Sequence, residues 1–292
     1  MIVGNDISNH QGEINFDIYS KNTNFVIMKA TEGTSYLDPK FIRNRSEARR
    51  CNLPIGYYHF ARPDLGNTPE NEAKWFLYNL GLGIMVKTGE IFCLDYEPPK
   101  NTVNPVDWCK KWLDYVCNIT GVKSFIYLNQ SQVRTFDWSP VAQAGYPLWL
   151  ACYDDQPNPT GYTGAWKDYY LKQWTSKQVV PGIKGNVDGD WFFGDVEGFK
   201  ALGLQKHSPS ASESPSESSS PSRSPSCSPS PSPSPEIPPT EEIPPTETEL
   251  INSIVGVVFY SHWGWIGPMG WRKRRKELMD LLNKYCSYGY DY

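Results

Sequence analysis

The chain has 292 residues, a net charge of −4 at pH 7 and 39% hydrophobic residues, a length that accommodates one large domain or two smaller ones. Its weak acidity argues against a nucleic-acid-binding protein, which is normally basic with clustered Lys and Arg. No apolar run is long enough to span a bilayer. The N-terminus lacks the basic and apolar segments of a signal peptide, so we expect a protein that is made in a cytoplasm and released by another route.

Short apolar runs alternate with helical patterns over the first part of the chain. This alternation predicts a parallel sheet in an α/β fold. Eight strand candidates indicate a small TIM-like barrel whose later helices are short or missing. The alternative is an open doubly wound sheet, which is weakened by the lack of a glycine-rich loop after the first strand. The expected strands are Ile2–Ile7, Phe25–Ala30, Ile55–Ala61, Glu90–Glu97, Ser124–Leu128, Pro147–Tyr153, Tyr169–Trp174 and Gly185–Asp190.

Three expected helices have readable ends. Their starts are Asp38-Pro39, Thr68-Pro69 and Asn104-Pro105, because a polar cap followed by Pro favours a first helical turn. Their expected ends lie near Cys51, Gly81 and Gly121.

The composition changes abruptly after Lys206. Residues 207–250 are rich in Ser and Pro, cannot bury a core and predict a disordered linker between a domain at 1–206 and a small module at 251–292. The module contains aromatic residues and a basic run, Arg272–Lys276, on a predicted amphipathic helix. It is interpreted as a module that binds the cell wall or an anionic polymer. Docking on the barrel, oligomerisation through 251–292 and association with a membrane surface are the alternatives.

Acidic residues recur where the predicted strands end. In EIFCLDYEPP, alternation places Asp95 and Glu97 on one face, where two like charges raise at least one pKa. The plain alternative is a strand end whose acids face water. Asp6 and Asp188 fall at matching places, and the ends of barrel strands form the active-site rim. Several carboxylates with aromatic rings between them point to glycoside hydrolysis.

Eight motifs, in order along residues 1–200, resemble those of the glycoside hydrolase family 25 lysozymes: DISNHQG, KATEG, YYHFARP, CLDYEP, FIYLNQS, PLWLACY, LKQWTS and GNVDGDWF. The resemblance implies an irregular (β/α)5(β)3 barrel. It also implies an N-acetylmuramidase that cleaves the β-1,4 bond between N-acetylmuramic acid and N-acetylglucosamine in bacterial peptidoglycan. The chain is similar to phage endolysins, so synthesis in the host cytoplasm and release to the wall are expected.

The same resemblance implies roles for residues of the cleft. Glu97 matches the general acid, and Asp95 matches the partner carboxylate that orients the 2-acetamido group of the substrate. Asp190 departs from an expected Asn and is interpreted as peripheral. No metal and no cofactor are implied. The residues expected to bind substrate are Asp6, Asp188, Tyr58, Tyr127, Trp149, Trp174, His59 and Arg62.

Two other functions stay open at this point. A chitinase-like glycosidase would also use acids two residues apart at a strand end, but Ile91 and Cys93 stand where the longer chitinase signature has acids. A cell-wall carbohydrate-binding barrel without catalysis is the non-enzyme alternative.

Overall fold

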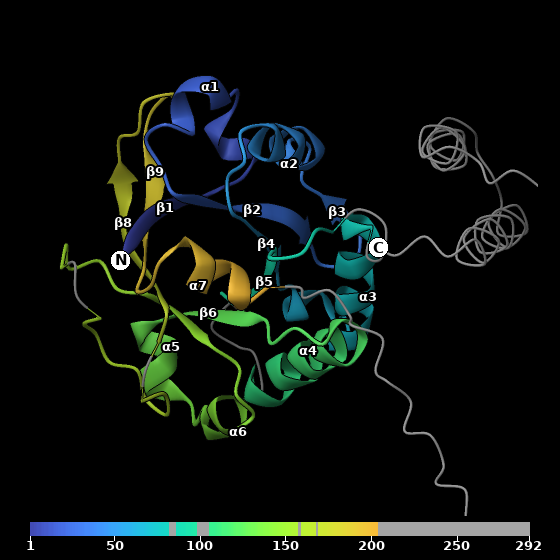
Figure 1. Ribbon diagram of the computed structural model, residues 1–292. Helices are drawn as coiled ribbons and strands as arrows, with labels where there is room; N and C mark the ends of the chain where they lie inside the picture. The colour runs from blue at the N-terminus through green and yellow to red at the C-terminus, as the bar shows by residue number, and fades with distance from the viewer. Residues whose placement is uncertain (82–85, 98–104, 157–158, 168, 204–292) are drawn as a thin grey trace, which may run out of the picture. The chain divides into compact units, whose positions relative to one another are not determined.

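A computed structural model of the chain describes residues 1–81, 86–97, 105–156, 159–167 and 169–203 (Figure 1). The predicted linker 207–250 and the predicted module 251–292 lie outside the described residues. Within the described residues, every helix is too short or too polar to cross a membrane.

Eight strands close into a barrel (Figure 1). Seven of them run parallel to one another, and β9 runs against both of its neighbours, β1 and β8. A short strand, β3 (Tyr36–Leu37), extends the end of β2 as a hairpin. The barrel strands are β1 (Ile2–Ile7), β2 (Phe25–Glu32), β4 (Ile55–Phe60), β5 (Ile91–Asp95), β6 (Phe125–Asn129), β7 (Leu148–Ala151), β8 (Leu171–Gln178) and β9 (Val187–Phe192).

Five β/α units precede three strands that have no described helix between them, and α7 follows β9. The predicted irregular barrel is confirmed, and the open doubly wound sheet is wrong because β1 pairs with both β2 and β9. The expectation of a wholly parallel sheet is wrong for β9. The helices are α1 (Phe16–Tyr19), α2 (Phe41–Arg50), α3 (Pro69–Leu80), α4 (Pro105–Thr120), α5 (Gln130–Thr135), α6 (Ser139–Gln143) and α7 (Val196–Ala201).

The ends of α3 are those predicted from the sequence. The Thr68 hydroxyl accepts a hydrogen bond from the Asn71 N–H, and Pro69 occupies the first turn. Gly81 ends the helix with φ +66°, a left-handed conformation that glycine adopts without strain. Helix α2 differs: it begins at Phe41, because the Asp38 carboxylate instead accepts hydrogen bonds from the backbone N–H groups of Lys40 and Asn9.

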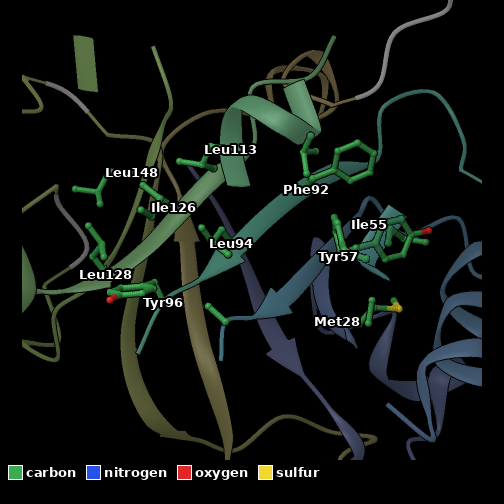
Figure 2. Packing of buried hydrophobic residues seen from close by; sticks show 14 of the residues in the cluster. Met28, Ile55, Tyr57, Phe92, Leu94, Tyr96, Leu113, Ile126, Leu128 and Leu148 are labelled. Carbon is green, nitrogen blue, oxygen red and sulfur yellow. The ribbon is translucent and has the colours of Figure 1, made fainter. Parts of the chain in front are cut away.

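Side chains along each strand alternate between two buried clusters. On β5, Phe92 and Leu94 join the large cluster between the strands and the helices (Figure 2). Ile91 and Cys93 join the smaller cluster inside the barrel. Phe199 of α7 packs on the rings of Phe25 and Phe192, with centroids 4.9 and 5.4 Å away, and so closes one end of the barrel.

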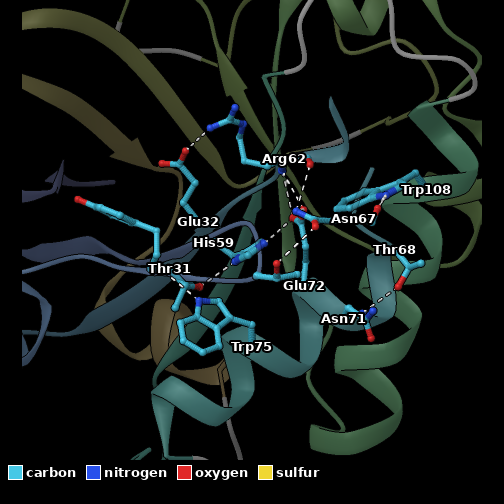
Figure 3. A network of polar contacts seen from close by, with 12 residues as sticks. Thr31, Glu32, His59, Arg62, Asn67, Thr68, Asn71, Glu72, Trp75 and Trp108 are labelled. Atoms are coloured by element: carbon cyan, nitrogen blue, oxygen red, sulfur yellow. Dashed lines mark hydrogen bonds and ion pairs between the residues drawn. The ribbon is translucent and has the colours of Figure 1, made fainter. Parts of the chain in front are cut away.

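A buried polar network ties β2, β4 and α3 together (Figure 3). His59 Nδ1 lies 2.8 Å from the Thr31 hydroxyl, and Nε2 lies 2.8 Å from Glu72 Oε2. The Glu72 carboxylate also accepts from the backbone N–H of Arg62 and from Asn67 Nδ2. One carboxylate therefore fixes both the end of β4 and the loop that follows it.

We predict that His59→Gln will flatten the pH dependence of the free energy of unfolding between pH 7 and 5. Burial lowers the pKa of His59 from 6.5, so the folded protein keeps the ring neutral while the unfolded chain takes up a proton. Wild-type stability therefore falls as the pH drops below the unfolded pKa, by at most about 1.4 kcal/mol per pH unit from this group.

Urea titrations at a series of pH values measure this slope. The matched control is His10→Gln, which alters an exposed histidine and should leave the slope as it is in the wild type. Equal slopes for the wild type and His59→Gln would show that His59 does not carry the effect.

Candidate active site

One end of the barrel gathers four carboxylates. Asp6 lies near the end of β1, Asp95 is the last residue of β5, and Glu97 follows it by two residues. Asp188 is the second residue of β9; because β9 runs against its neighbours, its start reaches the same rim, where Asp188 pairs with Asp6. All four residues line one cleft of about 310 Å³.

The cleft wall is aromatic and polar. Of the rings predicted to bind substrate, Tyr58, Tyr127 and Trp149 line it. The prediction of substrate-binding residues missed several others. Lys29 follows Ile27 by two residues on β2, so strand alternation predicts that both face the inside of the barrel. Gln173 lies near the end of a predicted strand, where the rim of the cleft is expected. The missed lining residues are Ile7, Ser8, His10, Gln11, Lys29, Phe60, Tyr153 and Gln173.

Gln173 holds three groups of the cleft in one arrangement. Its Nε2 donates to Asp6 Oδ2 at 2.8 Å. Its Oε1 accepts hydrogen bonds from the hydroxyls of Tyr127 at 2.9 Å and Tyr153 at 2.7 Å. An amide suits this place because it offers a donor and an acceptor on one planar group.

Asp95 and Glu97 have different surroundings. Asp95 is 8% exposed, pairs with Phe60 and Tyr127 on the neighbouring strands, and has one buried oxygen, Oδ1, that accepts no hydrogen bond from the described residues. Glu97 lies beyond the end of β5 and is exposed. The predicted shared strand face therefore ends at Asp95, and Glu97 stands at the entrance of the cleft.

Removal from water and repulsion by neighbouring acids raise the pKa values of Asp6, Asp95 and Glu97. The pKa of Asp6 rises from 3.8 to about 7, because the group is buried and lies near the charge of Asp188. Burial, and then Glu97, raise the pKa of Asp95 well above its usual range. Although Glu97 as a whole is exposed, its carboxyl group is partly shielded from water, and this desolvation, followed by the charge of Asp188, raises the pKa of Glu97. Lys29 acts in the opposite direction on both Asp95 and Glu97, so this cation limits the repulsion.

Three predicted substrate-binding residues do not line the cleft. His59 is fully buried within its network, so we no longer expect it to contact a sugar. Trp174 stacks on Trp191, with centroids 4.9 Å apart and the rings 9° from parallel. Alternation along β8 separates Trp174 from Gln173, which does face the cleft.

Arg62 is the third of these residues. Its guanidinium pairs with Glu32 at 2.7 Å (Figure 3) and with Asp64 at 2.8 Å. Glu32 also pairs with Lys29, at 2.7 Å, and Lys29 lines the cleft. Arg62 is thus separated from the cleft by one acid and one lysine.

The interpretation of Asp190 as peripheral is wrong. The side chain is fully buried, and its Oδ1 accepts a hydrogen bond from Trp149 Nε1 at 2.9 Å. Asp190 therefore lies behind the wall of the cleft and supports one of its rings.

Candidate metal ligands are not grouped in the described part of the chain. No set of three or more His, Cys, Asp or Glu residues there is arranged to hold a metal ion. The cysteines among these residues are free thiols. The absence of a metal and of a cofactor stays a prediction.

Comparisons with known proteins agree with this fold. The family model described as Glycosyl hydrolases family 25 matches residues 5–183. Lysozyme M1 of Streptomyces globisporus is 38% identical over 216 residues, which span 69% of this chain and 71% of that protein.

Solved structures give the same result. A bacterial lysozyme from Streptomyces coelicolor superposes with a TM-score of 0.62 at 27% identity, covering 69% of this chain and 96% of that one. The CTP1L endolysin superposes with a TM-score of 0.58 at 26% identity, covering 69% of this chain and 70% of that one. The chain therefore belongs to glycosyl hydrolases family 25 and is a glycoside hydrolase.

Proposed function

We propose that the chain is a muramidase that hydrolyses the β-1,4 bond between N-acetylmuramic acid and N-acetylglucosamine in bacterial peptidoglycan. The observation that carries the proposal is the pairing of a buried Asp95 with an exposed Glu97 in one acid-lined cleft. A glycosidase needs two carboxyl groups whose environments differ, so that one donates a proton while the other carries charge.

Asp95 suits the carboxylate role. Its Oδ1 is buried and receives no hydrogen bond from the described residues. The N–H of a substrate 2-acetamido group would supply that missing donor. Such a hydrogen bond stabilises the ionised form of Asp95, so substrate binding itself lowers the pKa of this group. By holding the acetamido N–H, Asp95 also orients the acetamido oxygen toward the anomeric carbon, where this oxygen assists cleavage of the glycosidic bond.

Glu97 suits the acid role. The charge of Glu97 raises the pKa of Asp95, so the ionisation of one of these carboxyls is linked to that of the other. When Asp95 becomes ionised against the acetamido N–H, its charge favours the protonated form of Glu97. Because Glu97 stands at the cleft entrance, its carboxyl can reach the leaving glycosidic oxygen and later a water molecule.

The remaining lining residues would bind and orient the sugars. Asp6 and Asp188 provide hydrogen-bond acceptors for hydroxyl groups, and the charge of Asp188 favours the protonated form of Glu97. Tyr58, Tyr127 and Trp149 border the cleft but are almost fully buried, so they shape its wall, whereas Tyr153, which is 58% exposed, offers a ring surface of the kind that packs against a pyranose.

A role in phage-induced lysis fits the likeness to the CTP1L endolysin. In this proposal the enzyme is made in the host cytoplasm and acts after release to the wall. Residues 251–292 would then bind the wall or a wall polymer, and the covalent tether through 207–250 would raise the effective concentration of the second binding event. Self-association through 251–292 is the competing role for this module.

The decisive experiment is digestion of purified peptidoglycan followed by identification of the new reducing ends. N-acetylmuramic acid ends support the proposal. N-acetylglucosamine ends would identify a glucosaminidase, and binding to the wall without release of reducing ends would identify a carbohydrate-binding protein.

Replacing either acid should lower the turnover of peptidoglycan. We expect Glu97→Gln to lower kcat about 10²–10⁴-fold, because the amide cannot donate the proton. Asp95→Asn should also lower kcat, because an amide cannot carry the negative charge that assists the acetamido group. Turnover of peptidoglycan measures both effects, and circular dichroism checks the fold.

The matched control for these variants is Glu197→Gln, an exposed acid on α7 that should leave turnover unchanged. Near-normal turnover by Glu97→Gln would remove Glu97 from the acid role.

Asp6→Asn should be more stable than the wild type at high pH, and its activity should be lower. The pKa of Asp6 is raised to about 7, so ionisation of Asp6 weakens the fold between about pH 4 and 7. The uncharged amide does not suffer this loss. The free energy of unfolding of the variant, relative to the wild type, should therefore be higher at pH 8 than at pH 4 by on the order of 1–4 kcal/mol. Urea unfolding at the two pH values measures it, and a variant that is no better at pH 8 than at pH 4 would contradict the assignment.

Deleting residues 251–292 should weaken binding to intact cell walls and spare the hydrolysis of soluble fragments. The physical reason is loss of a second, tethered binding event. Co-sedimentation with walls and turnover of soluble glycan fragments are the two measurements. Equal sedimentation of the full chain and the truncated chain would exclude wall targeting by this module, and gel filtration of both would test self-association.

A further inference from the structure

Asp190 occupies an unusual place for a charged residue type. It is fully buried on β9, one inward position beyond Asp188, and its strand neighbours are Gly4 on β1 and Gln173 on β8. Gly4 has no side chain to fill this part of the barrel, and an added Cβ there would lie 2.4 Å from the Phe25 ring. The Asp190 carboxyl is therefore packed inside the barrel, directly behind the cleft.

The two oxygens of Asp190 have different partners. Oδ1 accepts a hydrogen bond from Trp149 Nε1 at 2.9 Å. Oδ2 is buried and receives no hydrogen bond from any N–H or hydroxyl donor among the described residues. The Asp6 carboxyl lies on the same inward face of the neighbouring strand β1, two residues along from Gly4, and is the acid placed to share a hydrogen bond with Asp190. Two carboxyls make such a bond only when one of them carries a proton.

The surroundings decide which of the two carries it. Asp6 borders the cleft and already accepts a hydrogen bond from Gln173 Nε2 at 2.8 Å. Asp190 has no solvent contact, and no Lys or Arg of the described residues pairs with it. An ionised carboxylate in that position would be strongly unfavourable.

The ionisable groups that face Asp190 are all acids. They come from β1, β5, β9, α1 and the segment after β7, and they are Asp6, Cys93, Asp188, Tyr19 and Tyr153. Burial, followed by the charge of Asp6, raises the pKa of Asp190 well above its usual range.

We propose that Asp190 is a positioning residue that, as a neutral acid, donates a hydrogen bond to Asp6 and accepts one from Trp149. A carboxylate and a ring of the cleft wall are thereby held in one arrangement by a single buried carboxyl. The effect on catalysis rests on the proposed function, whereas the protonation of Asp190 can be measured without any turnover.

Two substitutions separate the elements of this role. Asp190→Asn keeps a donor for Asp6 and an acceptor for Trp149, and it introduces no change of charge if Asp190 is neutral. Asp190→Leu has a similar size but neither donor nor acceptor. We expect Asp190→Leu to lower kcat about tenfold or more, with a smaller change in KM, and Asp190→Asn to restore most of that loss.

The pH profile of kcat/KM tests whether Asp190 carries a charge. Asp188→Asn serves as the comparison, since removing the Asp188 charge should lower the pKa of Glu97 and move the alkaline limb to lower pH. Asp190→Asn should leave the limb where it is in the wild type. A shift like that of Asp188→Asn would show that Asp190 is ionised and would overturn the proposal, as would wild-type kcat in a folded Asp190→Leu.

Infrared difference spectroscopy tests the proton directly, even if Asp190→Leu fails to fold or the protein has no muramidase activity. At pH 7 the wild type minus Asp190→Asn spectrum should show the C=O band of a protonated carboxyl. Carboxylate bands alone would overturn the proposal. A protonated band that is lost in Asp6→Asn but kept in Asp190→Asn would place the proton on Asp6 and would also overturn it.

Discussion

The closure of the sheet through β1 is the constraint on which the rest of the structure depends. β1 pairs with β2 on one side and with β9, in the opposite direction, on the other. This pairing sets Asp6 opposite Asp188, although the two residues are far apart in the sequence. An open sheet would leave these acids on separate edges. Because the barrel closes, the acids of β1, β5 and β9 meet at one rim, and a cleft with glycosidase chemistry becomes possible.

That closure has an electrostatic cost, because it forces carboxyls of like charge together. Burial and repulsion raise the pKa of Asp6, Asp95 and Glu97 alike, so these groups weaken the fold as they ionise. Lys29 relieves part of the repulsion but is itself paired with Glu32. The compensation comes from packing, in one apolar cluster inside the barrel and a larger one beneath the helices. The cleft is thus a strained site that the surrounding core holds in place.

The elements that local chemistry dictates were predictable from the sequence. Thr68, Pro69 and Gly81 mark α3 because capping depends on neighbours within one turn. Alternation on β5 separated Cys93 from Leu94 because the period of a strand is local. The direction of β9 was not predictable, since it depends on which strands it joins. Nor was the burial of His59 and Asp190, because a partner such as Glu72 or Trp149 is found only once distant segments have packed.

Depth within the barrel gives identical chemical groups different roles. Glu97 at the entrance is exposed, so it can exchange a proton with a leaving group or with water. Asp95 is nearly buried, and in the proposed mechanism a bound acetamido group brings the donor on which its ionisation depends. Asp190 is deeper still, and both of its carboxyl oxygens have a hydrogen-bond partner only if the carboxyl is neutral. The free-energy cost of ionising a carboxyl rises with its burial. The deeply buried Asp190 therefore keeps its proton, whereas Glu97, at the entrance and nearest the substrate, can exchange one.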